Sequence, residues 1–368
     1  MKKGEKGVKS NYFNLILCAF SLIFLIVYLF KVDGGVNNFG DIFRQIHVGW
    51  LLVGIGCMLI YWFLDAVVLH MAIKPVHPSQ RFGVSMRLTM IGQYFNNVTP
   101  FAAGGQPAQA YFLVKRGAPL GETMTALITK FIVYQITLTV YCLVTMILKF
   151  TYFMSEVKVL MLAVIVGFAV HTAVTVMLIC VAFFKLGTIK AANFIIDILG
   201  RMKIVKDPEV KKEFVDRELE NFHTQFQYMS KHKMHLAKMC IITIVQLTVY
   251  FLIGNIIYLS FHLNGADTVT LVASQAFVLM ITAFVPIPGA LGAGEVSFYI
   301  FFSLFFPKSM ISLAVVLWRL MTFYLPIIVG LIITLFEKRR GNNLPIEKTP
   351  VVDDFINSGG EPVFKVKK

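Results

Sequence analysis

Two basic residues lie inside apolar stretches of this sequence, at matching distances from two proline–glycine motifs. Lys130 follows Pro100 by 30 residues, and Arg319 follows Pro288 by 31. A cation inside a membrane is costly and normally faces the protein interior or a water-filled cavity. Lysine and arginine are also side chains that bind phosphate. The pair therefore predicts a buried anion site; the alternative is a structural ion pair, with Glu295 as the partner of Arg319. The anion site and the ion pair are compatible if phosphate and Glu295 compete for the guanidinium of Arg319.

The two motifs interrupt apolar sequence in the same way. They are Phe95-Asn-Asn-Val-Thr-Pro-Phe-Ala-Ala-Gly-Gly-Gln-Pro107 and Phe284-Val-Pro-Ile-Pro-Gly-Ala-Leu-Gly-Ala-Gly-Glu295. Proline removes a backbone donor and glycine unwinds cheaply, so each motif breaks a helix. In a membrane such a break survives where it lines a protected cavity, and a matched pair in two halves indicates a transporter binding site. The predicted hinge residues are Pro100, Gly104, Gly105, Pro286, Pro288, Gly289, Gly292 and Gly294.

Polar groups near the breaks extend this predicted site. The N-termini of the broken helices would direct amide donors and positive dipole ends toward the membrane midplane, which suits a phosphate. The neutral side chains could instead cap helices, and Arg87 could extend to the inner surface or pair with Asp65. The predicted substrate-binding residues are Lys130, Arg319, Glu295, Asn96, Asn97, Thr99, Gln106 and Arg87.

Composition indicates the membrane environment that these residues need. Hydrophobic residues make up 57% of the 368 residues and charged residues 15%, with a mean hydropathy of +0.73. Soluble chains are nearer half apolar and a quarter charged. The net charge of +14 comes from segments between apolar runs, a positive-inside pattern that argues against nucleic-acid binding. The five cysteines show no metal-ligand spacing and no Walker loop occurs, so we predict no metal and no cofactor.

The hydropathy pattern predicts an all-α polytopic integral membrane protein. We expect about six full spans and two re-entrant hairpins of broken helices, near 82–117 and 269–306. One hairpin enters from the cytoplasm and the other from outside, which makes an inverted repeat suited to alternating access. The alternative counts both arms of the second hairpin as spans and gives eight crossings. The six predicted spans are 12–30, 48–72, 122–148, 158–184, 236–260 and 309–336.

Charge also predicts the orientation and the regions outside the bilayer. Both termini, 1–11 and 337–368, are expected in the cytoplasm, flanking membrane halves at 12–184 and 235–336. The basic amphipathic segment 185–234 lies between the halves and is also expected to be cytoplasmic. Its helix begins near Asp207-Pro208-Glu209 and lies on the membrane surface, docks beneath the bundle, or forms a solvated linker.

The two motifs, with Arg319 and Pro326 downstream, resemble the transmembrane region of lysylphosphatidylglycerol synthases. That family includes the multiple peptide resistance factor, and the similarity covers residues 12 to 336. The resemblance implies movement of aminoacylated phosphatidylglycerol between leaflets of a bacterial cell membrane, and a link to resistance against cationic antimicrobial peptides. Large members add a soluble aminoacyltransferase domain, for which the tail after residue 336 is too short. The family also often has arginine where this chain has Lys130, which binds phosphate less specifically.

These observations favour a flippase-like transporter of anionic or aminoacylated phospholipid, or of another lipid-linked phosphate. Its partner is membrane phospholipid, and transport is downhill or ion-coupled, with Glu295 as the candidate proton carrier. One alternative is a phosphatidylglycerol lysyltransferase, alone or with a separate soluble enzyme; only this alternative brings in a nucleic acid, the lysyl-tRNA. Another is a membrane scaffold that uses 185–234 as its docking surface. A homo-oligomer is compatible with each.

Overall fold

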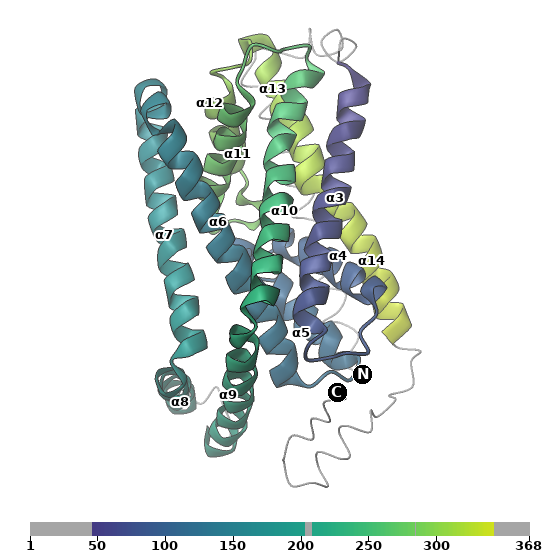
Figure 1. Ribbon diagram of the computed structural model, residues 1–368, viewed down its shortest axis with the longest axis vertical. Helices are drawn as coiled ribbons and strands as arrows, with labels where there is room; N and C mark the ends of the chain where they lie inside the picture. The colour runs from purple at the N-terminus through teal and green to yellow at the C-terminus, as the bar shows by residue number, and fades with distance from the viewer. Residues whose placement is uncertain (1–45, 203–207, 284, 342–368) are drawn as a thin grey trace.

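The computed structural model describes residues 46–202, 208–283 and 285–341, and these fold into helices and helical turns (Figure 1). Within those ranges, five helical segments are long and apolar enough to cross a membrane. They confirm the predicted spans from 48–72 onward, so the chain is an all-α polytopic membrane protein. The predicted span 12–30 lies outside the described residues. The five segments are α3 (Val48–Ile73), α6 (Leu120–Glu156), α7 (Lys158–Phe183), α10 (Lys233–Ser260) and Lys308–Glu337.

Two pairs of short helices form the hairpins. The first comprises α4 (Phe82–Val98), the turn η2 (Pro100–Ala102) and α5 (Gly105–Lys115). The second comprises α11 (Thr268–Thr282), the turn η3 (Pro288–Ala290) and α12 (Ala293–Phe302). At 15 and 10 residues, α11 and α12 are too short to cross about 30 Å of hydrocarbon at about 1.5 Å per residue. The hairpin arrangement, not the eight-span alternative, therefore describes this region.

The hairpins occupy opposite ends of the molecule and meet at their breaks. In Figure 1, α11 and α12 lie in the upper half, and α4 and α5 lie in the lower half. The turns η2 and η3 contact each other, and α4 also contacts η3. Two interrupted helices that enter from opposite ends and touch at their interruptions are the arrangement that the repeated motif predicts.

The backbone follows the same path through both breaks. In η2, Phe101 and Ala102 have φ of 54° and 51°, and in η3, Gly289 and Ala290 have φ of 61° and 47°. Each pair follows a proline directly. Left-handed φ values are costly for residues with a side chain and persist where the surrounding structure enforces them. The repeat is thus conserved in conformation, although a phenylalanine in one break replaces the glycine in the other.

The last span is interrupted just after Arg319. It consists of α13 (Lys308–Arg319), the π-helical turn η4 (Leu320–Tyr324) and α14 (Leu325–Gly341). A π turn changes the rotational register of the residues on its two sides and is frequent at functional sites. Here it directly follows the one arginine that the sequence places deep in this span.

A separate apolar cluster surrounds each hairpin. The cluster at the second hairpin is aromatic, and the one at the first hairpin is mainly aliphatic. Fully buried rings in the former include Phe153, Phe277, Phe298, Phe301 and Phe302. Buried residues in the latter include Leu69, Leu88, Ile91, Leu113 and Met239. The two packed clusters fix the hairpin arms and so hold the breaks in place between them.

Two helices connect the membrane halves. The helix α8 (Lys185–Arg201) is seen end-on below α7 in Figure 1, so its axis crosses that of α7. The next helix, α9 (Pro208–Lys231), buries Phe222 and Phe226 against Ile132 of α6 and Ala182 of α7. Of the placements considered for this helix from sequence, docking against the bundle is the one observed.

Candidate functional site

A cavity of about 230 Å³ lies where the two breaks meet. Its walls come from α3, α4, α6, α10, α11, both breaks and the last span. Six aromatic side chains line it: Tyr61, Phe101, Tyr134, Tyr250, Trp318 and Phe323. The polar side chains in the lining are Gln93, Asn96, Asn97, Thr282, Arg319 and Thr322. The cavity therefore combines aromatic faces with amides, hydroxyls and one guanidinium.

Arg319 forms a buried ion pair with Glu295 at the edge of this cavity. Its Nε lies 2.7 Å from Oε1 of Glu295, and its Nη2 donates a hydrogen bond of 2.8 Å to Oε2. The two residues are 5% and 1% exposed. Nη1 also donates to the carbonyl oxygen of Gly289 at 3.0 Å, and Nη2 to that of Ala290 at 3.3 Å. One side chain thus ties the last span to both the break and the second arm of the hairpin.

Local sequence explains why this pair can form. Glu295 lies in the first turn of α12, where its Oε2 also accepts a 2.8 Å hydrogen bond from the amide of Gly292. Gly292 has φ of 84°, which glycine adopts without strain. A Cβ at Gly294 would overlap Nη2 of Arg319, so the absence of a side chain there lets the guanidinium approach α12. The rings of Trp318 and Phe323 lie 4.7 and 5.4 Å from the guanidinium carbon.

A second buried ion pair lies beside the same cavity. Nζ of Lys130 is 2.8 Å from Oδ1 of Asp65. Two glutamine side chains also donate to this carboxylate: Gln246 at 3.2 Å and Gln93, which lines the cavity, at 3.4 Å. The expectation that Asp65 pairs with Arg87 is therefore wrong. Arg87 pairs instead with Glu337, and Lys130 of α6 reaches Asp65 from the neighbouring span.

The two ion pairs do not follow the repeat. Superposing the break prolines places Glu295 on Pro107, so the first hairpin has no acidic counterpart. Lys130 instead takes its partner from the span α3. The two cations thus lie at matching distances from their break prolines in the sequence, but each is neutralised by a different element of its half.

The neutral residues at the first break mainly cap the helices. Oδ1 of Asn96 accepts from the amide of Gly105 at 2.8 Å. Oγ1 of Thr99 accepts from the amide of Gly104 at 2.8 Å and donates to the carbonyl of residue 95. The side chain of Asn97 donates to the carbonyl of residue 93. Capping, the alternative considered for these residues, is thus the role observed for Asn96 and Thr99.

Only some of the predicted residues border the cavity itself. Asn96, Asn97, Arg319 and Gly289 line it. The lining does not include Thr99, Lys130, Glu295 or half-buried Gln106. Of these, Glu295 contacts the lining residue Arg319. Among the hinge residues, Pro100 and Pro288 begin η2 and η3, and Pro286 lies between α11 and η3. Gly104 and Gly105 leave room for the capping side chains of Thr99 and Asn96.

Arg87 belongs to a different cluster, away from the cavity lining. Its Nε donates a 3.0 Å hydrogen bond to Oε2 of Glu337 on α14. Arg116, just beyond α5, pairs with the other oxygen of the same carboxylate. Glu337 is buried. This cluster fastens the C-terminal helix to both arms of the first hairpin, which is a structural role.

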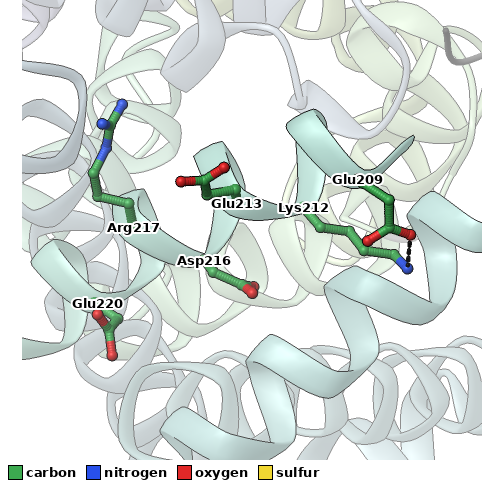
Figure 2. A pocket seen from close by; sticks show the side chains of 6 residues that line it. All are labelled: Glu209, Lys212, Glu213, Asp216, Arg217 and Glu220. Carbon is green, nitrogen blue, oxygen red and sulfur yellow. Dashed lines mark hydrogen bonds and ion pairs between the residues drawn. The ribbon is translucent and has the colours of Figure 1, made fainter. Parts of the chain in front are cut away.

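A second hollow lies on a single face of α9 (Figure 2). It is lined by Glu209, Lys212, Glu213, Asp216, Arg217 and Glu220. Lys212 pairs with Glu209 at 3.0 Å on the same helix. The hollow has no apolar wall and is a charged helix face, so it does not compete with the cavity as a binding site.

Several cavity residues were missed from sequence. Tyr61, Tyr134 and Tyr250 come from three different spans, and Gln93 links the lining to Asp65. Tyr61 and Asp65 are four residues apart on α3, so they share a helix face. Two hydrogen-bonding residues at that spacing within an apolar span could have predicted that this helix face points into the protein.

The charges around the cavity balance one another. Across the described part of the chain, no group of three or more His, Cys, Asp and Glu side chains could hold a metal ion. The two cations are each matched by one carboxylate, so these four residues together add no net charge at the cavity. The indole N–H of Trp318 is buried with no hydrogen-bond partner among the described residues, and Trp318 lines the cavity.

Comparison with known proteins identifies two similarities. A model of the family described as the transmembrane region of lysylphosphatidylglycerol synthase matches residues 15–330. A UPF0104 membrane protein of Archaeoglobus fulgidus is 26% identical to this chain over 303 residues. That alignment covers 78% of this chain and 86% of the archaeal protein. The family match includes both breaks and the four residues of the two ion pairs, and it ends within the last span.

Proposed function

Because the chain belongs to the family of lysylphosphatidylglycerol synthase transmembrane regions, we propose that it is a flippase-like transporter of phospholipid. The headgroup enters the cavity between the two breaks while the acyl chains remain in the bilayer. The observation that carries this proposal is the buried Arg319–Glu295 pair at the cavity edge, bound to the carbonyl groups of the broken helix. A charged group in that position is expensive in a membrane and is retained where it serves a substrate pathway.

The charge balance of the Arg319–Glu295 pair favours a headgroup with both a negative and a positive charge. A phosphate that takes Arg319 leaves Glu295 buried without a partner, and an unpaired buried charge destabilises a protein by about 3 to 5 kcal/mol. A headgroup with an ammonium as well as a phosphate supplies the missing cation. The aromatic lining, including Tyr61 and Tyr250 with ring centroids 5.1 Å apart, adds faces that attract an ammonium. Aminoacylated phospholipids meet this requirement, whereas phosphatidylglycerol alone does not.

Transport follows from relative movement of the two repeats about the fixed site. In this proposal, the cluster of Arg87, Arg116 and Glu337, which fastens α14 to the first hairpin, also closes that end of the protein. Its release would open the cavity toward that side. For a headgroup without an ammonium, protonation of Glu295 would be the other way to free Arg319 for the phosphate, and it would couple transport to a proton. Following the positive-inside rule, we place both termini on the cytoplasmic side of a bacterial plasma membrane.

The test is leaflet exchange in liposomes that contain the purified protein. Fluorescent phosphatidylglycerol, lysylphosphatidylglycerol and phosphatidylethanolamine are compared, with Arg319→Ala and Glu295→Gln alongside the parent. The matched control is Arg217→Ala, which removes an arginine from the exposed face of α9. We expect exchange of the two ammonium-bearing lipids that both site variants lose and the control keeps. Absence of exchange for all three lipids, or full exchange by both site variants, would refute the proposal.

A further inference from the structure

The helix α8 has an apolar face that no described part of the protein covers. Phe194 is 65% exposed and Met202, directly after the helix, is 62% exposed. Ala191, Ile195 and Ile198 are also exposed and lie on the same side of the helix. Single exposed apolar residues are normal on any protein, but a contiguous row along one helix indicates an interaction surface.

The opposite face of α8 is fixed to α9 by polar contacts. Nδ2 of Asn193 donates to Oδ1 of Asp216 at 3.0 Å. Asp197 pairs with Lys212 at 2.8 Å, and Lys185 pairs with Glu220 at 2.8 Å. Ile196 is buried on the same side. These contacts fix the rotation of α8 about its axis. Because they hold the polar face against α9, the apolar face points away from α9.

The position of α8 at the end of the span α7 favours the lipid bilayer as the partner of that face. The helix begins two residues after the end of α7, a span by length and composition, and lies across its axis (Figure 1). Phe183 and Phe184 at the junction are exposed, as are Met177 and Val181 on the last two turns of α7. The apolar surface of α8 therefore continues the lipid-facing surface of the span. A helix that crosses the end of a span lies at the level of the lipid headgroups.

Two cations border the apolar face. Lys190 and Arg201 are both exposed and lie on one edge of the face, beside Phe194 in helical projection. In a helix that lies in the membrane surface, basic side chains at this edge extend to the headgroup phosphates. They are attracted most strongly to headgroups with a net negative charge.

We propose that α8 is an interfacial helix that binds the surface of the surrounding bilayer and prefers anionic lipid. Phe194, Ile195, Ile198 and Met202 insert at the boundary between headgroups and acyl chains. Lys190 and Arg201 contact anionic headgroups of the leaflet at the C-terminal end of α7. A second protein is a weaker occupant, because the face is continuous with the lipid-facing side of α7 and two cations border it.

The insertion can be tested with tryptophan probes in the full chain. Phe194→Trp and Ile198→Trp are reconstituted in vesicles of brominated phosphatidylcholine, and the signal of the parent protein is subtracted. Glu213→Trp, on the charged face of α9 (Figure 2), is the control for a probe in water. We expect quenching of both α8 probes to exceed that of the control by at least about twofold. Quenching of the α8 probes by aqueous acrylamide to the level of the control would place the face in water. Protection from both quenchers would show a protein cover. Either result overturns the proposal.

The lipid preference needs a second measurement. The Phe194→Trp probe is compared in vesicles that carry the bromine label on either phosphatidylglycerol or phosphatidylcholine at equal fraction. We expect about twofold stronger quenching by the anionic lipid, and loss of that difference when Lys190→Gln and Arg201→Gln are added. Equal quenching by the two lipids in the presence of both cations would refute the anionic preference.

Discussion

Gly294 lies directly beneath the guanidinium of Arg319, at a distance that leaves no room for a Cβ. The arginine reaches Glu295 only because the residue before it on α12 has no side chain. The ion pair at the cavity thus depends on a close approach of backbone and guanidinium, and one methyl group at this point would separate the two charges.

We therefore expect Gly294→Ala to behave as a charge mutation. It should lower the free energy of unfolding by about 3 kcal/mol, because it displaces one member of a buried pair. Gly56→Ala in α3 is the matched control, since a Cβ there would meet nothing within 4 Å. The control should be neutral or slightly stabilising, because alanine favours helix over glycine. Thermal unfolding in detergent measures both variants, and equal midpoints would contradict the steric argument.

Arg319→Ala should abolish binding of the lipid headgroup, whereas Arg319→Lys should retain part of it. Lysine keeps the charge but cannot contact Glu295 and the carbonyl groups of Gly289 and Ala290 together. Binding of a short-chain aminoacylated phospholipid by calorimetry separates the three proteins. Unchanged affinity in both variants would remove Arg319 from the site.

The Lys130–Asp65 pair predicts a non-additive result. Asp65→Asn alone should destabilise the protein by about 2 kcal/mol, because largely buried Lys130 loses its carboxylate. Addition of Lys130→Gln should restore part of that loss. The matched control is Asp197→Asn, which breaks the partly exposed pair with Lys212 and should change stability by less than about 1 kcal/mol. Additive effects of the two buried substitutions would show that the charges do not interact.

Glycine substitutions at Phe101 and Ala103, two residues apart in the first break, should change the stability in opposite directions. Phe101 has φ of 54°, so Phe101→Gly should relieve strain and stabilise the fold by about 0.5 to 1 kcal/mol. Ala103 has φ of −84°, so Ala103→Gly should destabilise by about 0.5 to 1 kcal/mol through chain entropy. Both side chains are exposed, so little packing is lost. A loss of stability in the Phe101 variant would show that its ring is needed at the cavity wall.

The sequence predicts the helices of this protein better than it predicts the contacts between them. Hydropathy and the two Pro–Gly motifs predicted five described spans and both hairpins, because membrane crossing and helix breaking are local properties. The ion-pair partners are not local. Asp65 is closer in sequence to Arg87 than to Lys130, yet packing of α3 against α6 decides the contact. Likewise Arg87 and Glu337 are 250 residues apart, and no local pattern joins them.

The docking of α9 should depend on pH through His223. Its Nδ1 lies 3.1 Å from the carbonyl oxygen of Ala182 at the end of α7. Burial is the main cause that lowers the pKa of His223 below its ordinary value of 6.5, and Lys185 nearby acts in the same direction. The released helix then binds the proton more tightly than the docked helix, so docking is complete above pH 6.5 and weakens as pH falls through the lowered pKa.

Limited proteolysis of the α8–α9 region across this pH range measures that docking. We expect faster cleavage in acid for the parent protein and little change for His223→Gln, which cannot titrate. Acid-induced cleavage of equal size in both proteins would assign the effect to another group.

In the transport that we propose, the paired charges at the cavity also affect the response to membrane voltage. The charges of Arg319 with Glu295, and of Lys130 with Asp65, add to zero, so the four residues together carry no net gating charge in a conformational change without cargo. The electric field then does no net work on these four residues, and it acts on the cargo with about 2.3 kcal/mol per unit charge for each 100 mV. A headgroup with balanced charges crosses without electrical work. A headgroup with one excess ammonium is held toward the negative side, so its export must be driven by its concentration or by a coupled ion.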